Sequence, residues 1–227
     1  MKKSERDKLL FLLAITSGSA DGWAILGLGH AFVANMTGNT VLLGIGIFGM
    51  QSERTHPLIA LIFYATGVAA GSLFTRHVKS DATWSRSVSF TLLFEALLLL
   101  LAEAAWIYLN GAPSRETSFI LLACVAFAIG LQSGALLPLK LPGVITTYIT
   151  GTWTTLVSGL VAIGGQAPSR ESKEVVEERV VIQIGFLLTY FLAAVFTGLI
   201  FKYVPTMVGI VSSLPVLTVA IYGAIRG

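Results

Sequence analysis

Long apolar runs dominate the chain, and they limit it to a narrow set of folds. The run Val180–Phe201 extends for 22 residues without a charged side chain. A transmembrane helix needs about 20 mostly apolar residues to cross the hydrocarbon core of a bilayer. The composition agrees, because 55% of the residues are hydrophobic and only 12% are charged, whereas soluble domains carry about 25% charged residues. The long runs also lack the polar stripe of a soluble surface helix. The sequence therefore predicts an all-α integral membrane protein.

Eight apolar segments can be distinguished, and six are long enough to span the membrane. The other two, Thr37–Met50 and Thr150–Gly164, give only about 21 Å of helix each. An extended, strand-like stretch before each short helix would make up the missing length. We therefore expect six full-length transmembrane helices and two short broken segments of the strand-then-half-helix kind. The six long segments are Lys8–Leu28, Leu58–Arg76, Val88–Leu109, Ser118–Leu137, Val180–Lys202 and Met207–Ile225.

The two short segments share a phrase, which predicts an internal two-fold repeat. The first copy is Phe32–Thr40 and the second is Ile145–Trp153; both place a β-branched stretch before Thr-Gly and a short apolar helix. A turn-forming stretch near Asn110 separates the halves. We expect a first repeat over residues 1–110 and a second over 111–227, within one integral membrane domain. Paired broken segments in the two halves of a transporter point to its binding site.

The basic residues leave two topologies open. If the short segments cross the membrane, there are eight spans and parallel halves, and ten of the fifteen Lys and Arg residues lie inside. If the segments are re-entrant, there are six spans and inverted halves, and twelve lie inside. The positive-inside rule favours the second arrangement, whereas the extended-plus-helix geometry favours the first. Both arrangements place the N-terminus in the cytoplasm.

The two Thr-Gly phrases supply most of the candidate ligand-binding residues. Irregular backbone inside a membrane is tolerated only where it is buried in protein or lines a wet cavity. Thr37 and Thr150 also suit helix N-caps, and the positive ends of both short helices would then face one interior zone. The same residues could instead bond to one another as a packing contact. The candidates are Asn35, Thr37, Gly38, Asn39, Thr40, Thr147, Tyr148, Thr150, Gly151 and Thr152.

Asp21 stands out because it is a carboxylate inside the first apolar segment. An acid at this depth is functional by default, since its burial is costly without a partner. Asp21 could bind a cation or carry a proton, or it could cap a broken helix at the membrane surface. Gln132 occupies the matching place in the second half and could orient a ligand. Glu95, in the fourth segment, is a second candidate for a proton relay.

Several classes of function find no support in the sequence. No His, Cys or acidic residues have metal-ligand spacing, and there is no nucleotide-binding or hydrolase motif. We therefore expect no metal, no cofactor and no enzymatic activity. The net charge of +3 is small and the basic residues lie in loops, which indicates membrane orientation rather than nucleic-acid binding. The partners expected are the lipid bilayer and a small molecule or ion; a homo-oligomer is compatible with so small a bundle.

The motifs together resemble the YoaK family of small bacterial integral membrane proteins, which is defined as a domain of unknown function. The resemblance rests on Gly18 with Asp21-Gly22, on Phe32–Thr40, on Gly130–Gly134 and on Thr146–Thr152. It spans nearly the whole chain and implies a multi-pass protein of the bacterial inner (plasma) membrane, but no substrate. From the broken segments we expect a secondary transporter or permease for a small polar or anionic solute, proton-coupled through Asp21. The alternative is a non-transporting lipid-interacting, sensory or assembly subunit.

Overall fold

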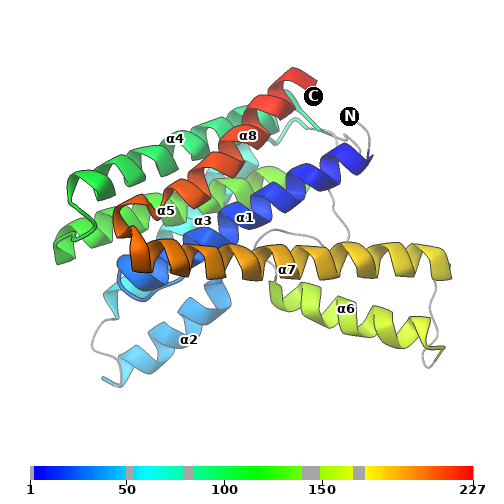
Figure 1. The fold of residues 1–227 in the computed structure, drawn as a ribbon, viewed down its shortest axis with the longest axis horizontal. Helices are drawn as coiled ribbons and strands as arrows, with labels where there is room; N and C mark the ends of the chain where they lie inside the picture. Colours follow the sequence, from blue (N-terminus) through cyan, green and yellow to red (C-terminus); the bar gives the residue numbers. More distant parts are fainter. Residues whose placement is uncertain (1–2, 50–53, 79–83, 140–148, 166–171, 227) are drawn as a thin grey trace.

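A computed structural model describes residues 3–49, 54–78, 84–139, 149–165 and 172–226, and these residues are almost entirely helical (Figure 1). No strand occurs among them. Two single-turn 3₁₀ helices, Leu137–Leu139 and Pro205–Met207, each follow a longer helix. The α-helices are α1 (Lys3–Gly27), α2 (Met36–Ile47), α3 (Thr55–Phe74), α4 (Arg86–Tyr108), α5 (Arg115–Leu136), α6 (Ile149–Ile163), α7 (Lys173–Tyr203) and α8 (Ile210–Arg226).

Six of the described helical segments are long and apolar enough to cross a membrane. They correspond to α1, α3, α4, α5, α7 and α8, and the last of these spans is counted from Pro205, five residues before α8 begins. The helices α2 and α6 have only 12 and 15 residues, about 18 and 22 Å of length. This division into six long and two short helices is the one that the sequence predicts.

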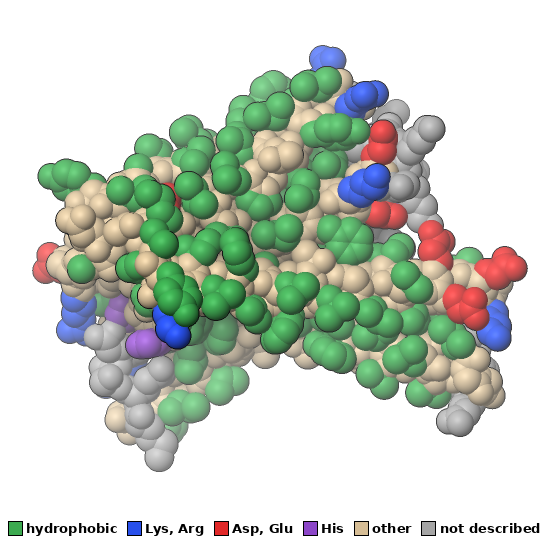
Figure 2. Space-filling model, in the orientation of Figure 1, with side chains coloured by type: hydrophobic (Ala, Val, Ile, Leu, Met, Phe, Trp, Pro, Cys, Tyr) green, Lys and Arg blue, Asp and Glu red, His purple; other side chains and the backbone are tan. Residues whose placement is uncertain are grey.

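The outer surface of the bundle suits contact with lipid. Large apolar side chains are exposed along α7, for example Val181, Phe191 and Leu192, and hydrophobic side chains cover much of the visible face (Figure 2). In the same view the charged side chains gather toward the two ends of the bundle. Because a bilayer replaces water around the middle of such a bundle, exposed apolar residues there are favourable rather than costly.

Glycines allow the closest helix contacts. The helix α3 packs along α5, and α1 packs along α7. A Cβ atom on Gly130 would overlap the main-chain carbonyl of Tyr64, and one on Gly18 would overlap the main-chain carbonyl of Tyr190. Small residues at such positions let membrane helices approach closely enough for backbone contact. The two glycine contacts therefore fix α3 against α5 and α1 against α7.

The short helices start in the middle of the bundle and leave it in opposite directions. In Figure 1, α2 runs from the centre toward the end at which the α4–α5 turn lies, and α6 runs from the centre toward the other end. The two helices pack on the neighbours that follow them in the chain, α2 on α3 and α6 on α7.

The structure differs from the sequence prediction in the stretch before α2. Residues 31–35 form an irregular loop with bends at Val33 and Ala34 instead of an extended strand. The physical reason is that the N–H groups of these two residues turn to the Asp21 carboxylate, so no strand partner is needed. The corresponding stretch before α6 lies outside the described residues. The charged segment that follows Ser172 is also helical, and forms the first turns of α7.

Candidate functional site

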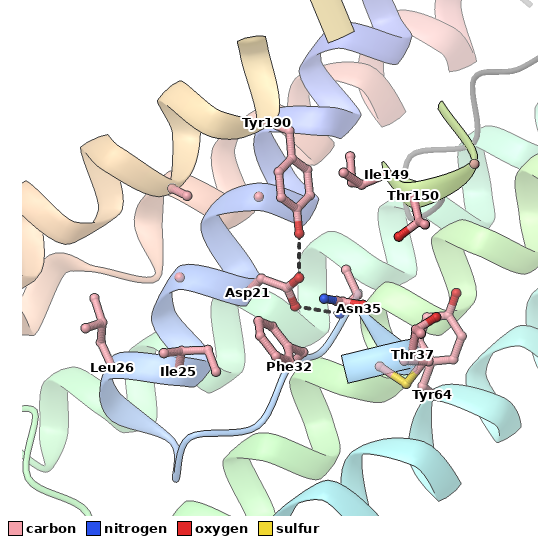
Figure 3. Close-up of a pocket in the computed structure, with 16 residues that line it drawn as sticks. Asp21, Ile25, Leu26, Phe32, Asn35, Thr37, Tyr64, Ile149, Thr150 and Tyr190 are labelled. Atoms are coloured by element: carbon pink, nitrogen blue, oxygen red, sulfur yellow. Dashed lines mark hydrogen bonds between the residues drawn. The ribbon is translucent and has the colours of Figure 1, made fainter. Parts of the chain in front are cut away.

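A cavity of about 680 Å³ lies in the middle of the bundle, where α2 and α6 begin (Figure 3). Its walls come from α1, the loop before α2, and the helices α2, α3, α6 and α7. Cavities of 300–1,000 Å³ with mostly apolar walls and a few polar groups are typical of small-molecule sites. The lining residues are Gly18, Asp21, Gly22, Ile25, Leu26, Phe32, Ala34, Asn35, Met36, Thr37, Tyr64, Ile149, Thr150, Gly151, Tyr190 and Ala194.

Asp21 is the centre of a hydrogen-bond network on one wall of this cavity. Its Oδ1 accepts bonds from the backbone N–H groups of Val33 and Ala34, each at 2.7 Å. Its Oδ2 accepts a bond from the Tyr190 hydroxyl of α7, which Figure 3 shows reaching down to the carboxylate. The side chain is only 5% exposed. The hydrogen bonds of one buried carboxylate therefore connect α1 to the loop before α2 and to α7.

Two asparagines shape the start of α2. Asn35 is its N-cap, and the side-chain oxygen of Asn35 accepts a bond from the Gly38 N–H at 3.2 Å. Asn39 is fully buried and bonds to both the N–H and the carbonyl of Phe32. The N-cap is thus Asn35, and the prediction that Thr37 caps this helix is wrong, because the helix begins at Met36 and Thr37 lies inside its first turn. Thr37 is thereby left to face the cavity.

The opposite wall contains Tyr64, and its hydroxyl is bonded to a serine behind the cavity lining. The Tyr64 hydroxyl of α3 donates to Ser133 Oγ of α5 at 3.0 Å, and the Ser133 hydroxyl donates to the Ile129 carbonyl. The neighbouring Gln132 is buried and donates to Ser17 Oγ of α1 at 2.9 Å. Gln132 therefore joins α5 to α1 and does not line the cavity.

The structure brings together about half of the residues that the sequence singled out. Asp21, Asn35, Thr37, Thr150 and Gly151 all line the cavity. The others lie elsewhere, as follows: Gly38 against the Phe32 ring, Asn39 beneath the loop, Thr40 exposed on α2 with its hydroxyl bonded to the Met36 carbonyl, Gln132 between α5 and α1, and Thr152 buried on α6. Thr147 and Tyr148 lie outside the described residues.

Tyr64 and Tyr190 are the hydroxyl-bearing cavity residues that the sequence analysis did not predict. A single tyrosine in an apolar run looks the same as one that faces lipid, so neither was distinguishable. The signal that could have found them is their equal place in the third apolar segment of each predicted repeat. Tyr64 lies three residues before Gly67, and Tyr190 lies three residues before Ala193.

The buried acids of α4 lie away from the cavity lining. Glu95 is fully buried, and neither of its carboxyl oxygens has a hydrogen-bond partner among the described residues. Glu103 accepts a bond from the Gly209 N–H at 2.9 Å, just before α8. No group of three or more His, Cys, Asp or Glu side chains that could hold a metal ion occurs in the described part of the chain.

Six apolar spanning helices with an exposed apolar surface define a multi-pass membrane protein, and comparison with known proteins agrees. Residues 9–222 match a family described as "Protein of unknown function (DUF1275)", and the chain belongs to this family. It is also 31% identical over 195 residues to the UPF0700 transmembrane protein YoaK of Bacillus subtilis (strain 168). That alignment covers 86% of this chain and 83% of the relative. No solved structure matches significantly.

Proposed function

We propose that the protein is a secondary transporter, and not an enzyme, whose substrate is a small polar solute that binds in the central cavity. The observation that carries the proposal is that two short helices begin at one interior cavity and run to opposite ends of the bundle. In transporters built from inverted repeats, discontinuous helices end at a midplane substrate site. The multi-pass character of the chain and its relative supports a membrane role of this kind.

We further propose that the two halves form an inverted repeat with six spans and two re-entrant helices. The main helix contacts occur in matching pairs: α1 packs on α7 as α5 packs on α3, and α1 packs on α8 as α5 packs on α4. The glycine contacts of Gly18 with Tyr190 and of Gly130 with Tyr64 match in the same way. The membrane expected is the bacterial plasma membrane, with the N-terminus in the cytoplasm.

Asp21 and Glu95 are the side chains proposed to carry protons, because both are acids buried within spanning helices. An acid in this environment marks ion and proton pathways in membrane proteins. If transport depends on a proton at Asp21, the Asp21→Asn variant should lose the pH dependence of uptake. Survival of that dependence in a folded variant would exclude Asp21 as the coupling residue.

A test of the transporter proposal needs no knowledge of the substrate. Thr37→Cys and Thr150→Cys, made in a Cys124→Ala background, place thiols on the cavity wall. A transporter must open the cavity to water, so a membrane-impermeant thiol reagent should label both variants in membrane vesicles. Leu192→Cys, on the lipid-facing side of α7, is the matched negative control, and Glu177→Cys at the exposed end of α7 is the positive control.

A non-transporting sensory or assembly role is the second candidate function. It is favoured by the fact that both oxygens of Asp21 already accept hydrogen bonds from within the chain. A carboxylate with a purely structural role would be bonded in this way. A sealed cavity is expected in that case. Thr37→Cys and Thr150→Cys would then resist the reagent as fully as Leu192→Cys does, and the transporter proposal would be abandoned.

A further inference from the structure

The chemistry of the cavity wall limits the charge of what can bind there. Of the described residues that line the cavity, Asp21 alone has an ionisable acid or base of the Asp, Glu, Lys, Arg or His type. An anion would thus lie near a carboxylate without a cationic side chain to balance it. Inside a membrane protein the effective dielectric constant is low, so this repulsion is much larger than in water. The positive N-terminal ends of α2 and α6, about half a charge each, offset this carboxylate, so the wall has no net positive charge with which to hold a free anion.

A cation is disfavoured for two separate reasons. Both Asp21 oxygens already accept bonds from Val33, Ala34 and Tyr190, so a cation would have to displace these donors. The N-terminal ends of α2 and α6 also face the cavity through Thr37 and Thr150. Each helix N-terminus carries about half a positive charge, which repels a cation.

The remaining polar groups of the cavity wall are neutral, and they can both donate and accept hydrogen bonds. Asn35 has a carboxamide at the cavity wall, and Thr37 and Thr150 have hydroxyls there (Figure 3). An amide provides two donors and an acceptor oxygen, and a hydroxyl provides one donor and two lone pairs. Around them lie apolar side chains, including Ile25, Leu26 and Phe32. Such a wall complements a molecule with an apolar body and a polar edge that both donates and accepts.

We propose that the cavity binds an uncharged organic molecule that carries both hydrogen-bond donors and acceptors, such as a carboxamide, with Asn35, Thr37 and Thr150 contacting its polar edge. This inference rests on the proposed function, because it concerns the ligand of the same site. It narrows the small polar solutes of that proposal to uncharged ones. It also assigns specificity to side chains on α2 and α6 and not to the Asp21 carboxylate.

The test compares three probes of one shape that differ in charge. Benzamide is uncharged, benzoate is an anion and benzylamine is a cation at neutral pH. Binding to the purified protein in detergent micelles is followed by saturation-transfer NMR. We expect benzamide to bind saturably and at least about tenfold more tightly than either charged probe. Thr37→Val and Thr150→Val, which remove a hydroxyl at nearly constant shape, should each weaken benzamide about three- to tenfold, the value of one hydrogen bond.

Matched controls lie on the same two helices. The Thr40 and Thr154 hydroxyls bond to main-chain carbonyls one turn earlier and lie outside the cavity lining. Thr40→Val and Thr154→Val should therefore leave benzamide binding unchanged. Equal losses in control and cavity variants would overturn the assigned contacts.

The other outcomes separate this inference from the proposed function. Benzoate binding as tightly as benzamide would overturn the uncharged class and leave the transporter proposal standing. Preference for benzylamine would do the same. If none of the probes binds while Thr37→Cys is labelled from water, the inference fails alone. If none binds and Thr37→Cys also resists labelling, both proposals fail.

Discussion

At the residue scale, the Asp21 carboxylate accepts hydrogen bonds from three donors. Two are backbone N–H groups in an irregular loop, and the third is the Tyr190 hydroxyl. Buried donors that lose their acceptor cost about 1–3 kcal/mol each. The network is therefore a structural requirement of the cavity wall, whatever the cavity binds.

The first prediction follows from this network. Asp21→Ala leaves three buried donors without their acceptor, and we expect it to lower the free energy of unfolding by at least about 2 kcal/mol. Glu177→Ala is the control, since the Glu177–Lys173 pair is exposed and such pairs contribute about 0–1 kcal/mol. Thermal unfolding of the purified proteins in detergent measures both. Equal stability of Asp21→Ala and wild type would show that the loop does not depend on this carboxylate.

Sequence could identify Asp21 but not its partners. A carboxylate in an apolar run is conspicuous from composition alone, whereas the Tyr190 hydroxyl is 169 residues away in the chain. The N-cap of α2 shows the same limit on a smaller scale. Both Asn35 and Thr37 are good capping residues, and only the turn of the preceding loop toward Asp21 makes Asn35 the cap.

At the scale of elements, the closest backbone contacts between helices depend on glycines in α1, α3 and α5. Our second prediction compares two of the helical glycines. A methyl group on Gly130 would overlap the Tyr64 carbonyl, which is main chain and cannot rotate away. We expect Gly130→Ala to destabilise the protein by about 1–3 kcal/mol, the usual cost of overpacking.

Gly44 of α2 is the control for this substitution, because nothing lies within 4 Å of its added Cβ. Gly44→Ala should be neutral or stabilising by up to about 1 kcal/mol, since alanine is the better helix former. Midpoints of thermal unfolding rank the two variants. A Gly130→Ala protein as stable as Gly44→Ala would mean that α3 and α5 can separate at little cost.

The lengths of the helices were largely predictable from the sequence, because the length of an apolar run indicates the length of the membrane-spanning helix. The first short helix was expected at Thr37–Met50 and occurs at Met36–Ile47. The main error is at α7, which was expected from Val180 and begins at Lys173. Its first two turns are charged and extend beyond the apolar run, so a hydropathy argument does not detect them.

At the scale of the whole molecule, the direction in which the short helices leave the cavity decides the topology. In a six-span inverted arrangement, the far ends of α2 and α6 lie on opposite sides of the membrane. In an eight-span arrangement they lie on the same side. Phe48 follows α2 and is 84% exposed, and Ser172 is exposed just before α7. These two positions therefore distinguish the arrangements that the sequence left open.

The third prediction is that Phe48→Cys and Ser172→Cys, in a Cys124→Ala background, react with an impermeant thiol reagent from opposite sides. Phe48→Cys should be labelled in intact cells, and Ser172→Cys only in inverted vesicles. Tyr108→Cys, at the exposed end of α4, should follow Phe48→Cys. Labelling of Phe48→Cys and Ser172→Cys from the same side would establish eight spans instead.

The bond between Asp21 and Tyr190 also has a consequence for how the protein is made. A ribosome adds about 5–20 residues per second, so the 169 residues that separate the two take roughly 10 to 30 seconds to synthesise. Throughout that time α1 is complete while α7, the helix that covers Gly18 and Asp21, does not yet exist. Contact between a carboxylate and lipid tails costs free energy. We therefore expect α1 to be sheltered during biogenesis, by the translocation channel or an insertase, until the second half of the chain has been made.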